Sequence, residues 1–223
     1  MRSLFPSLVV VLAVSGCGGS DSTTGPSQPR STMTLFVSSI TNMTGDLGGL
    51  RGADARCQTL ATAAGAGART WHAYLSLERD ADNGNRPTDA RSRIGSGPWV
   101  NAKGATVATG VADLHARKGD ATVFVDEKGQ QINGQWPGSP SPVEHDIMTG
   151  SNADGTLLAG FTCGDWTSSA ATTFGQVGHS DGLGPGGDTS GALSSWNSAH
   201  SNQNCANTAP RGGAGRIYCF AIN

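Results

Sequence analysis

The stretch LRGADARCQTLATAA at residues 50–64 carries the strongest structural signal in this chain. Its apolar residues recur at intervals of three and four, which is the spacing of one buried face of an α-helix: Leu50, Ala53, Cys57, Leu60, Ala61 and Ala64. Gly65 follows at the position where a glycine commonly ends a helix. Because Cys57 belongs to the apolar face, we expect its side chain to point into the core as a structural cysteine.

Short strands surround this helix in the sequence. Residues 35–37 (LFV) and 123–125 (VFV) are apolar runs typical of buried strands, and residues 71–75 (WHAYL) alternate as a strand does. A second, shorter helix is predicted over residues 88–94. The last strand, residues 217–222 (IYCFAI), carries Cys219. These elements predict a mixed α+β domain with many turns.

Composition limits the class of protein. The 223 residues include only 14% charged side chains, against about 25% in soluble proteins. The 33 glycines and 10 prolines show no Gly-X-Y period, which excludes collagen. A formal net charge of −2 without a basic stripe argues against a nucleic-acid partner. No apolar run reaches the roughly 20 residues of a membrane-spanning helix.

The first residues read as an export signal. Arg2 precedes a short apolar run at residues 8–14 (LVVVLAV), and small residues then lead to Cys17. The ending VSGC at residues 14–17 resembles the lipobox of bacterial lipoproteins, in which the cysteine is diacylated and becomes the mature N-terminus. Gly18, rather than an aspartate, follows the cysteine, which favours the outer membrane over retention at the inner membrane. Whether the protein faces the periplasm or the cell surface stays open.

Three segments follow from this signal. Residues 1–16 are predicted to be a signal peptide, and residues 17–32 a lipidated N-terminus and flexible tether rich in Gly, Ser, Thr and Pro. Residues 33–223 are predicted to form the domain. The expected partner at the N-terminus is therefore the membrane, reached through the lipid anchor.

Four cysteines remain in the domain: Cys57, Cys163, Cys205 and Cys219. An even number in an exported chain implies two disulfides, and the spacing alone allows three ways of pairing them. Zinc is the competing use of four cysteines, but none of them forms a C-x-x-C pair.

Six motifs occur in an order that resembles a known fold: residues 50–57 (LRGADARC), 71–76 (WHAYLS), 89–94 (DARSRI), 149–155 (TGSNADG), 163–167 (CGDWT) and 217–220 (IYCF). The chain resembles the C-type-lectin-like fold, more closely its endostatin-like branch, over residues 33–223. It is similar in the same way to a domain of uncharacterised bacterial lipoproteins. The resemblance implies an α+β fold with one main helix, one shorter helix, a long loop region and two disulfides, Cys57–Cys219 and Cys163–Cys205.

Two ligand sets of these relatives do not transfer. Sugar-binding C-type lectins hold calcium with Glu-Pro-Asn or Gln-Pro-Asp and a later Trp-Asn-Asp, whereas this chain has neither tripeptide and reads Trp196-Asn197-Ser198. Calcium needs six to eight oxygen ligands, so calcium binding is doubtful and no cofactor is expected. The zinc site and the arginine surface of endostatin have no evident counterpart in the sequence.

The sequence contains no motif whose neighbouring residues support a catalytic or a metal site. Gly178-His179-Ser180-Asp181-Gly182 matches G-x-S-x-G, but the glycine-rich run after it cannot begin the helix that a nucleophile elbow requires. The five histidines form no H-E-x-x-H or other close-spaced motif, so no metal site is predicted, although distant histidines can still meet in a fold. We therefore expect no enzyme, with a hydrolase using Ser180 as the alternative.

The long polar segment at residues 171–203 is the candidate binding region, because long loops on rigid domains commonly carry function. The residues expected to contact a ligand are His179, Asp181, Asp188, Trp196 and Asn197, while Trp196 has a second interpretation as the core anchor beneath the loop. The function expected is a non-catalytic binding or adhesion module, anchored in the cell envelope, that recognises a surface glycan or a surface or matrix protein. A purely structural envelope lipoprotein is a further alternative.

Overall fold

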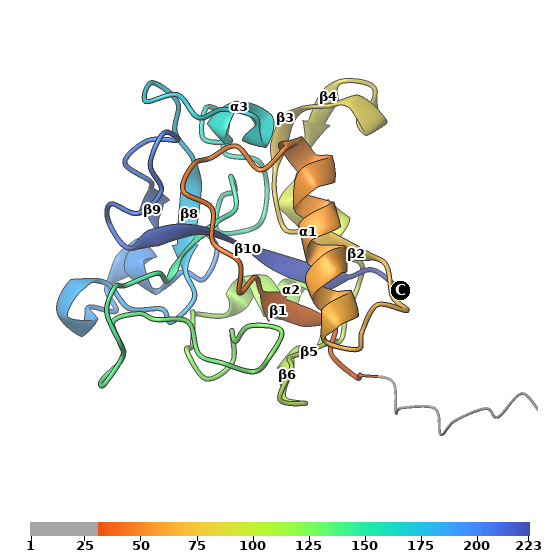
Figure 1. The fold of residues 1–223 in the computed structure, drawn as a ribbon, viewed down its shortest axis with the longest axis vertical. Coiled ribbons are helices and arrows are strands. Elements are labelled where there is room, and N and C mark those ends of the chain that lie inside the picture. The colour runs from red at the N-terminus through yellow and green to blue at the C-terminus, as the bar shows by residue number, and fades with distance from the viewer. Residues whose placement is uncertain (1–30) are drawn as a thin grey trace, which may run out of the picture.

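A nine-residue strand near the C-terminus, β10 (Gly213–Ala221), runs across the centre of the fold (Figure 1). The computed structural model describes residues 31–223; the predicted signal peptide, Cys17 and most of the tether lie outside the described residues. In Figure 1, α1 and β2 lie beside one end of β10, and β8 and β9 lie beside the other. This separation places the helix far from the strands that build the site described below.

The main sheet forms around β10. Its strands follow the order β1 (Leu35–Val37), β10, β7 (Asp146–Met148), β8 (Gln176–His179) and β9 (His200–Ser201), and β2 (Trp71–Ala73) also pairs with β10. The second half of β10 pairs antiparallel with β1 and β2, and its first half pairs parallel with β7. Two small hairpins complete the strands: β3 (Leu77–Asp80) with β4 (Arg86–Thr88), and β5 (Trp99–Val100) with β6 (Thr106–Ala108).

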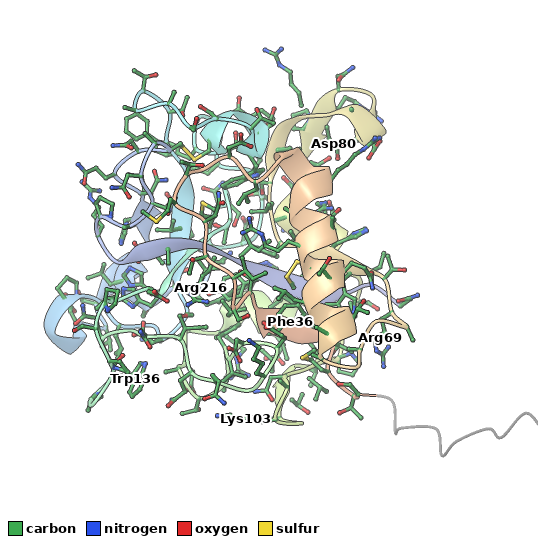
Figure 2. The ribbon with its side chains drawn as sticks, in the orientation of Figure 1. Phe36, Arg69, Asp80, Lys103, Trp136 and Arg216 are labelled. Atoms are coloured by element: carbon green, nitrogen blue, oxygen red, sulfur yellow. A yellow bond between two sulfur atoms is a disulfide. The ribbon has the colours of Figure 1, made fainter. Side chains whose placement is uncertain are left out.

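Both faces of β10 are buried, which explains why IYCFA is apolar without alternation. Ile217 and Cys219 pack into a cluster on the α1 side of the sheet. Tyr218 and Phe220 pack into a second cluster, since successive side chains of a strand point to opposite faces. Figure 2 shows Phe36, a member of the first cluster, in the interior beside α1, whereas Lys103 lies at the periphery.

The predicted helix is confirmed as α1 (Gly49–Ala63). Its buried residues are Ala53, Cys57, Leu60 and Ala61, which all belong to the predicted apolar face. Gly65 has φ of +75°, the left-handed conformation that ends many helices. Cys57 forms a disulfide with Cys219, so the covalent bond joins α1 to the second half of β10.

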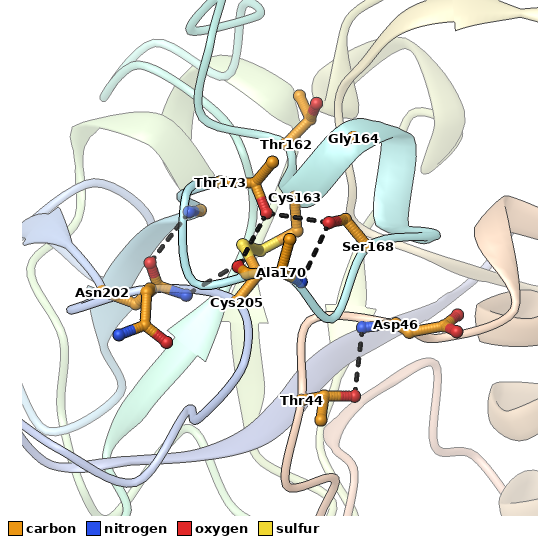
Figure 3. The surroundings of a disulfide bond; sticks show 12 residues. Thr44, Asp46, Thr162, Cys163, Gly164, Ser168, Ala170, Thr173, Asn202 and Cys205 are labelled. Atoms are coloured by element: carbon orange, nitrogen blue, oxygen red, sulfur yellow. Dashed lines mark hydrogen bonds between the residues drawn. A yellow bond between two sulfur atoms is a disulfide. The ribbon is translucent and has the colours of Figure 1, made fainter.

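The second disulfide joins Cys163, at the start of α3 (Cys163–Trp166), to Cys205. Figure 3 shows Ser168, Thr173 and Asn202 around it; the Asn202 amide donates to Cys163 Sγ at 3.8 Å. The two bonds nest in the way that the resemblance implied. The protein is thus a mixed α+β domain with two disulfides.

Three predictions need correction. Residues 123–125 do not form a strand. Of these residues, only Val125 makes an isolated β-bridge. The backbone forms a turn, in which the N–H groups of Val123 and Phe124 donate to the Asp120 carbonyl, and the Phe124 side chain is buried in the core. The predicted second helix is a single 3₁₀ turn, Ala90–Arg93. The segment at residues 171–203 is no continuous loop, because it contains β8 and β9.

Several short elements had no strong signal in the sequence. They are α2 (Val111–Ala116) and 3₁₀ turns at Ala81–Asn83, Pro185–Gly187 and Gly191–Ser194. Within residues 31–223, none of the helices has the length and apolar character needed to cross a membrane.

Candidate metal centre

Three neighbouring strands bring four titratable side chains together at the end of the sheet away from α1. Asp146 begins β7 and is the register partner of His179 at the end of β8. His200 begins β9, paired with Val177 of β8, and His145 directly precedes β7. The cluster therefore depends on strand pairing between segments that lie far apart in the sequence.

The imidazole Nε2 atoms converge on one carboxylate oxygen. Asp146 Oδ1 lies 3.3 Å from Nε2 of His179, 3.4 Å from Nε2 of His145 and 3.7 Å from Nε2 of His200. The Nε2 atoms of His179 and His200 are 2.9 Å apart. Ligand atoms of His145, Asp146 and His179 all lie within 4.8 Å of one another.

The other nitrogen of each ring faces an oxygen that accepts hydrogen bonds. His145 Nδ1 lies 2.7 Å from Asp181 Oδ1, His179 Nδ1 lies 2.9 Å from the Leu193 carbonyl, and His200 Nδ1 lies 2.9 Å from the Ser201 carbonyl. A carbonyl oxygen only accepts, so Nδ1 of His179 and of His200 carries the proton. The neutral rings of His179 and His200 then carry their lone pairs on Nε2. Orientation of this kind, with the outer nitrogen held by a carboxylate or a carbonyl, is typical of histidines that bind metals.

Asp146 is the unsatisfied group of the cluster. Its side chain is 1% exposed, and neither carboxylate oxygen accepts a hydrogen bond from any described residue. Burial raises the pKa of Asp146 to about 7, although the neighbouring His145 opposes part of this shift. A buried carboxylate without donors is costly, and a bound cation removes that cost.

His179 and His200 resist protonation. Burial lowers the pKa of His179 to about 4, and repulsion from His145 and His200 adds to this shift. Burial also lowers the pKa of His200. The rings of His179 and His200 therefore present lone pairs rather than protons to Asp146.

Asp181 holds His145 in place. Burial raises the pKa of Asp181, but the hydrogen bond and charge of His145, with two backbone N–H donors, outweigh burial and the net pKa is lowered. Those donors are Gln135 at 2.7 Å and Leu183 at 3.1 Å. Gly134 is required beside it, because a Cβ there would lie 2.2 Å from Asp181 Oδ2. The Asp181 carboxylate is thus ionised, and both of its oxygens accept hydrogen bonds.

A pocket of about 290 Å³ opens onto the three imidazoles. Its lining residues are Gln135, His145, His179, Pro185, Leu193, His200 and Arg211. His200 is 26% exposed on this side, while His145, Asp146 and His179 are 3% exposed or less. The cluster is consequently a buried site with one accessible face.

Two distances between the ligand atoms match those around a tetrahedral zinc ion. Zinc bonds to nitrogen and oxygen are about 2.0–2.1 Å long, which places tetrahedral ligand atoms about 3.3–3.4 Å apart. Asp146 Oδ1 lies at 3.3 and 3.4 Å from His179 and His145. His200, the more exposed of the histidines, departs from this spacing, since its Nε2 lies 2.9 Å from that of His179 and 3.7 Å from Asp146 Oδ1.

The residues expected from the sequence to bind a ligand are dispersed. His179 belongs to the cluster and Asp181 supports it. Asp188 is exposed and accepts from the Ser190 backbone N–H, and Trp196 is fully buried in the second core cluster. Asn197 is buried and its amide donates to the Tyr74 hydroxyl. The structure places these last two residues in packing rather than at the pocket.

Ser180 is also buried. Its side-chain oxygen contacts no hydrogen-bond partner among the described residues, and its backbone N–H donates to the His145 carbonyl. A serine nucleophile needs a base within hydrogen-bond reach and access for a substrate. The geometry therefore offers no support for the hydrolase alternative.

His145, Asp146 and His200 are not among the residues expected from the sequence to bind a ligand. The available signal was weak: a His-Asp pair at residues 145–146 and a His-x-Asp pattern at residues 179–181. Only the pairing of β7, β8 and β9 shows that these belong together.

No protein-family model matches this chain, and no curated protein matches it either.

Proposed function

We propose that the protein is a non-catalytic binding module of the bacterial cell envelope, held by a lipid on Cys17, whose recognition region is organised by a Zn²⁺ ion. The ligands are Nε2 of His145, His179 and His200 and Oδ1 of Asp146. The observation that supports this most is the convergence of three oriented imidazoles on a buried carboxylate that no described residue satisfies. The C-type-lectin-like fold is part of the same proposal.

The donor set favours zinc over other ions. Imidazole nitrogens with one carboxylate suit Zn²⁺ and neighbouring transition metals, whereas calcium takes six to eight oxygens. The four cysteines of the domain are consumed in two disulfides and offer no thiolate. Four protein ligands are typical of zinc ions that stabilise structure rather than activate water.

The position of the ion explains how it serves binding. It joins β7, β8 and β9 at the floor of the pocket, where the chain is rich in glycine and has few apolar side chains to pack. Strands of two to four residues are held weakly by their own hydrogen bonds. A metal at this point fixes the pocket wall and its polar rim against a glycan or protein ligand.

Zinc titration of the purified protein tests the metal centre. Calorimetry is expected to show one high-affinity Zn²⁺ per chain, and His179→Ala is expected to remove it. His72→Ala is the matched control, since His72 lies in β2 and its ring contacts the Arg93 carbonyl. Equal zinc binding by the His179→Ala variant and the unmodified protein would overturn the metal centre.

Recognition is tested on arrays of glycans and of envelope or matrix proteins. The zinc-loaded protein is expected to bind a subset of targets, and removal of zinc by a chelator is expected to weaken that binding. The same targets bound equally with and without zinc would contradict a metal-organised site. A Cys17→Ser variant is expected to leave the membrane fraction, which tests the anchor separately.

A further inference from the structure

The chain that follows His200 leads directly to a disulfide. β9 contains only His200 and Ser201, and its pairing with the β8 segment continues past the end of the strand. The Asn202 N–H donates to the Gly175 carbonyl at 2.8 Å, and the Gly175 N–H donates to Asn202 Oδ1 at 2.9 Å. Cys205 follows three residues after Asn202 and forms the second disulfide. The covalent bond therefore lies close to the point where β9 is attached to the sheet.

Cys163, the other half of this disulfide, contacts the same residues. Its N–H donates to the Phe174 carbonyl at 2.8 Å, just before β8 begins. Its Sγ lies 3.8 Å from the Asn202 side-chain nitrogen, and Figure 3 shows Asn202 beside the bond. A Cβ on Gly175 would lie 3.1 Å from the same sulfur. The disulfide thus packs against the residues that join β8 to β9, two positions beyond His200.

Cys163 also begins α3, whose four residues adopt a left-handed turn. Their φ values are +47°, +60°, +55° and +63°, and only Gly164 among them is a glycine. Other residues adopt this conformation singly as a rule, because Cβ then approaches the following carbonyl oxygen. The buried Trp166 side chain and the Asp165 carboxylate, which accepts from two backbone N–H groups of β3, hold the end of the turn. The disulfide holds its start, so we expect a reduced Cys163 to relax and to loosen this end of β8.

His200 is the proposed zinc ligand that depends most on the position of β9. Its side chain is 26% exposed, and its Nδ1 contacts the carbonyl of the adjacent Ser201. The rings of His145 and His179 are buried, and each contacts a residue at least 14 positions away in the sequence. A shift of β9 consequently displaces the His200 ring while the other two rings keep their partners.

We propose that the Cys163–Cys205 disulfide gates the zinc centre: the domain binds zinc tightly only after this bond has formed, because the bond positions His200. This inference rests on the proposed zinc centre. In forming the S–S bond, the two thiols give two electrons and two protons to a disulfide-bearing oxidant, which becomes a dithiol. Metal loading thereby follows oxidation of the exported chain. Cys163 and Cys205 are positioning residues, since neither contacts the metal.

Competition with a zinc-chelating dye tests the gate on purified protein with both disulfides formed and on the variant Cys163→Ala/Cys205→Ala. We expect the variant to bind zinc about 10–100-fold more weakly, the loss typical when a contact that orients a ligand is removed. Cys57→Ala/Cys219→Ala is the matched control, because that disulfide joins α1 to β10 away from β9 (Figure 1). We expect the control variant to lose stability and to keep its zinc affinity.

Asn202→Ala tests the same link with both disulfides intact, and it replaces the cysteine variant where that variant does not fold. The change removes the acceptor of the Gly175 N–H, and we expect zinc affinity to fall about tenfold. Gln203→Ala, at the exposed neighbouring residue, is expected to leave the affinity unchanged. Equal affinities of these two variants would overturn the link between the disulfide and β9.

A double-mutant cycle with His200→Ala shows whether the disulfide acts through this ligand. His200→Ala is expected to weaken zinc binding by itself, and removal of Cys163 and Cys205 is then expected to add little. Additive losses would overturn the positioning of His200.

The gate and the metal centre fail separately in these experiments. Equal zinc affinity with and without the Cys163–Cys205 bond overturns the gate and leaves the metal centre intact. An equal loss in Cys57→Ala/Cys219→Ala also overturns it, because the effect is then one of general stability. No zinc binding by the protein with both disulfides overturns the proposed function on which the inference rests.

Discussion

The Nε2 atoms of His179 and His200 lie 2.9 Å apart while Nδ1 of each ring is held by a backbone carbonyl. When both rings are neutral and carry the proton on Nδ1, the two Nε2 atoms face each other with lone pairs and no proton between them. Burial lowers the pKa of both histidines, which works against a shared proton. A metal ion bound to both rings resolves the contact and satisfies the buried Asp146 carboxylate at the same time.

Zinc is expected to stabilise the folded domain. A ligand at one hundred times its dissociation constant adds about 2.7 kcal/mol to the free energy of unfolding. For a domain of this size that corresponds to a rise in Tm of about 5–10 °C. Thermal unfolding followed by circular dichroism checks this, and an identical Tm in zinc and in chelator would contradict it.

Asp146→Asn separates the metal role of this side chain from a packing role. In chelator, the amide N–H groups of asparagine can donate to the imidazole lone pairs, so we expect the variant to be more stable than the unmodified protein by about 1 kcal/mol. In zinc the order is expected to reverse, because the carboxylate ligand is lost. Urea unfolding in both conditions measures this; a variant that is less stable in chelator would count against the buried, unpaired carboxylate.

Asp181 is a positioning residue, since it orients His145 through a 2.7 Å hydrogen bond and does not itself reach the centre of the cluster. Loss of such a partner typically lowers metal affinity about 10–100-fold. We expect this loss for Asp181→Ala, measured by competition with a zinc-chelating dye. Asp188→Ala, at an exposed aspartate of the same segment, is the matched control. Similar affinities for both variants would remove Asp181 from the site.

Trp196 is expected to matter for stability and not for metal binding. Its ring is fully buried, stacks on Phe124 with centroids 5.4 Å apart, and donates to the Leu114 carbonyl at 3.0 Å. Replacement of a buried tryptophan by alanine typically costs about 3–5 kcal/mol. Urea unfolding of Trp196→Ala is expected to show this loss while the folded variant still binds one zinc. A stability near that of the unmodified protein would contradict the packing.

The Cys163–Cys205 disulfide closes a sequence separation of 42 residues. Chain-entropy estimates for a loop of this length give about 4 kcal/mol of stabilisation. The double variant Cys163→Ala/Cys205→Ala is therefore expected to lower the free energy of unfolding by about 2–4 kcal/mol. Peptide mapping without reductant provides the covalent check, and a Cys57–Cys163 peptide would contradict the pairing.

The helix and the last strand could be predicted because their signals are local. The apolar spacing around Cys57 and the run IYCFA each describe an element long enough to show its own pattern. Residues 123–125 have the composition of a strand, yet burial of Phe124 against Trp196 prevails over strand propensity.

The metal cluster had no comparable signal. Its ligands lie at residues 145, 146, 179 and 200, in or directly before strands of only two to four residues. Gly178 illustrates how a contact between distant segments determines the residue at a position. A Cβ there would lie 2.1 Å from the Trp196 carbonyl oxygen, so the close packing of β8 against residues 196–197 requires glycine. Such a contact between distant segments cannot be read from either segment alone.

Anomalous diffraction at the zinc absorption edge, on crystals of the zinc-loaded protein, tests the metal centre most directly. We expect one strong peak about 2.0–2.1 Å from Nε2 of His145, His179 and His200 and from Oδ1 of Asp146. A protein that binds zinc with its peak elsewhere, or a cluster in which Asp146 accepts a hydrogen bond from a protonated histidine and no peak appears, would contradict it.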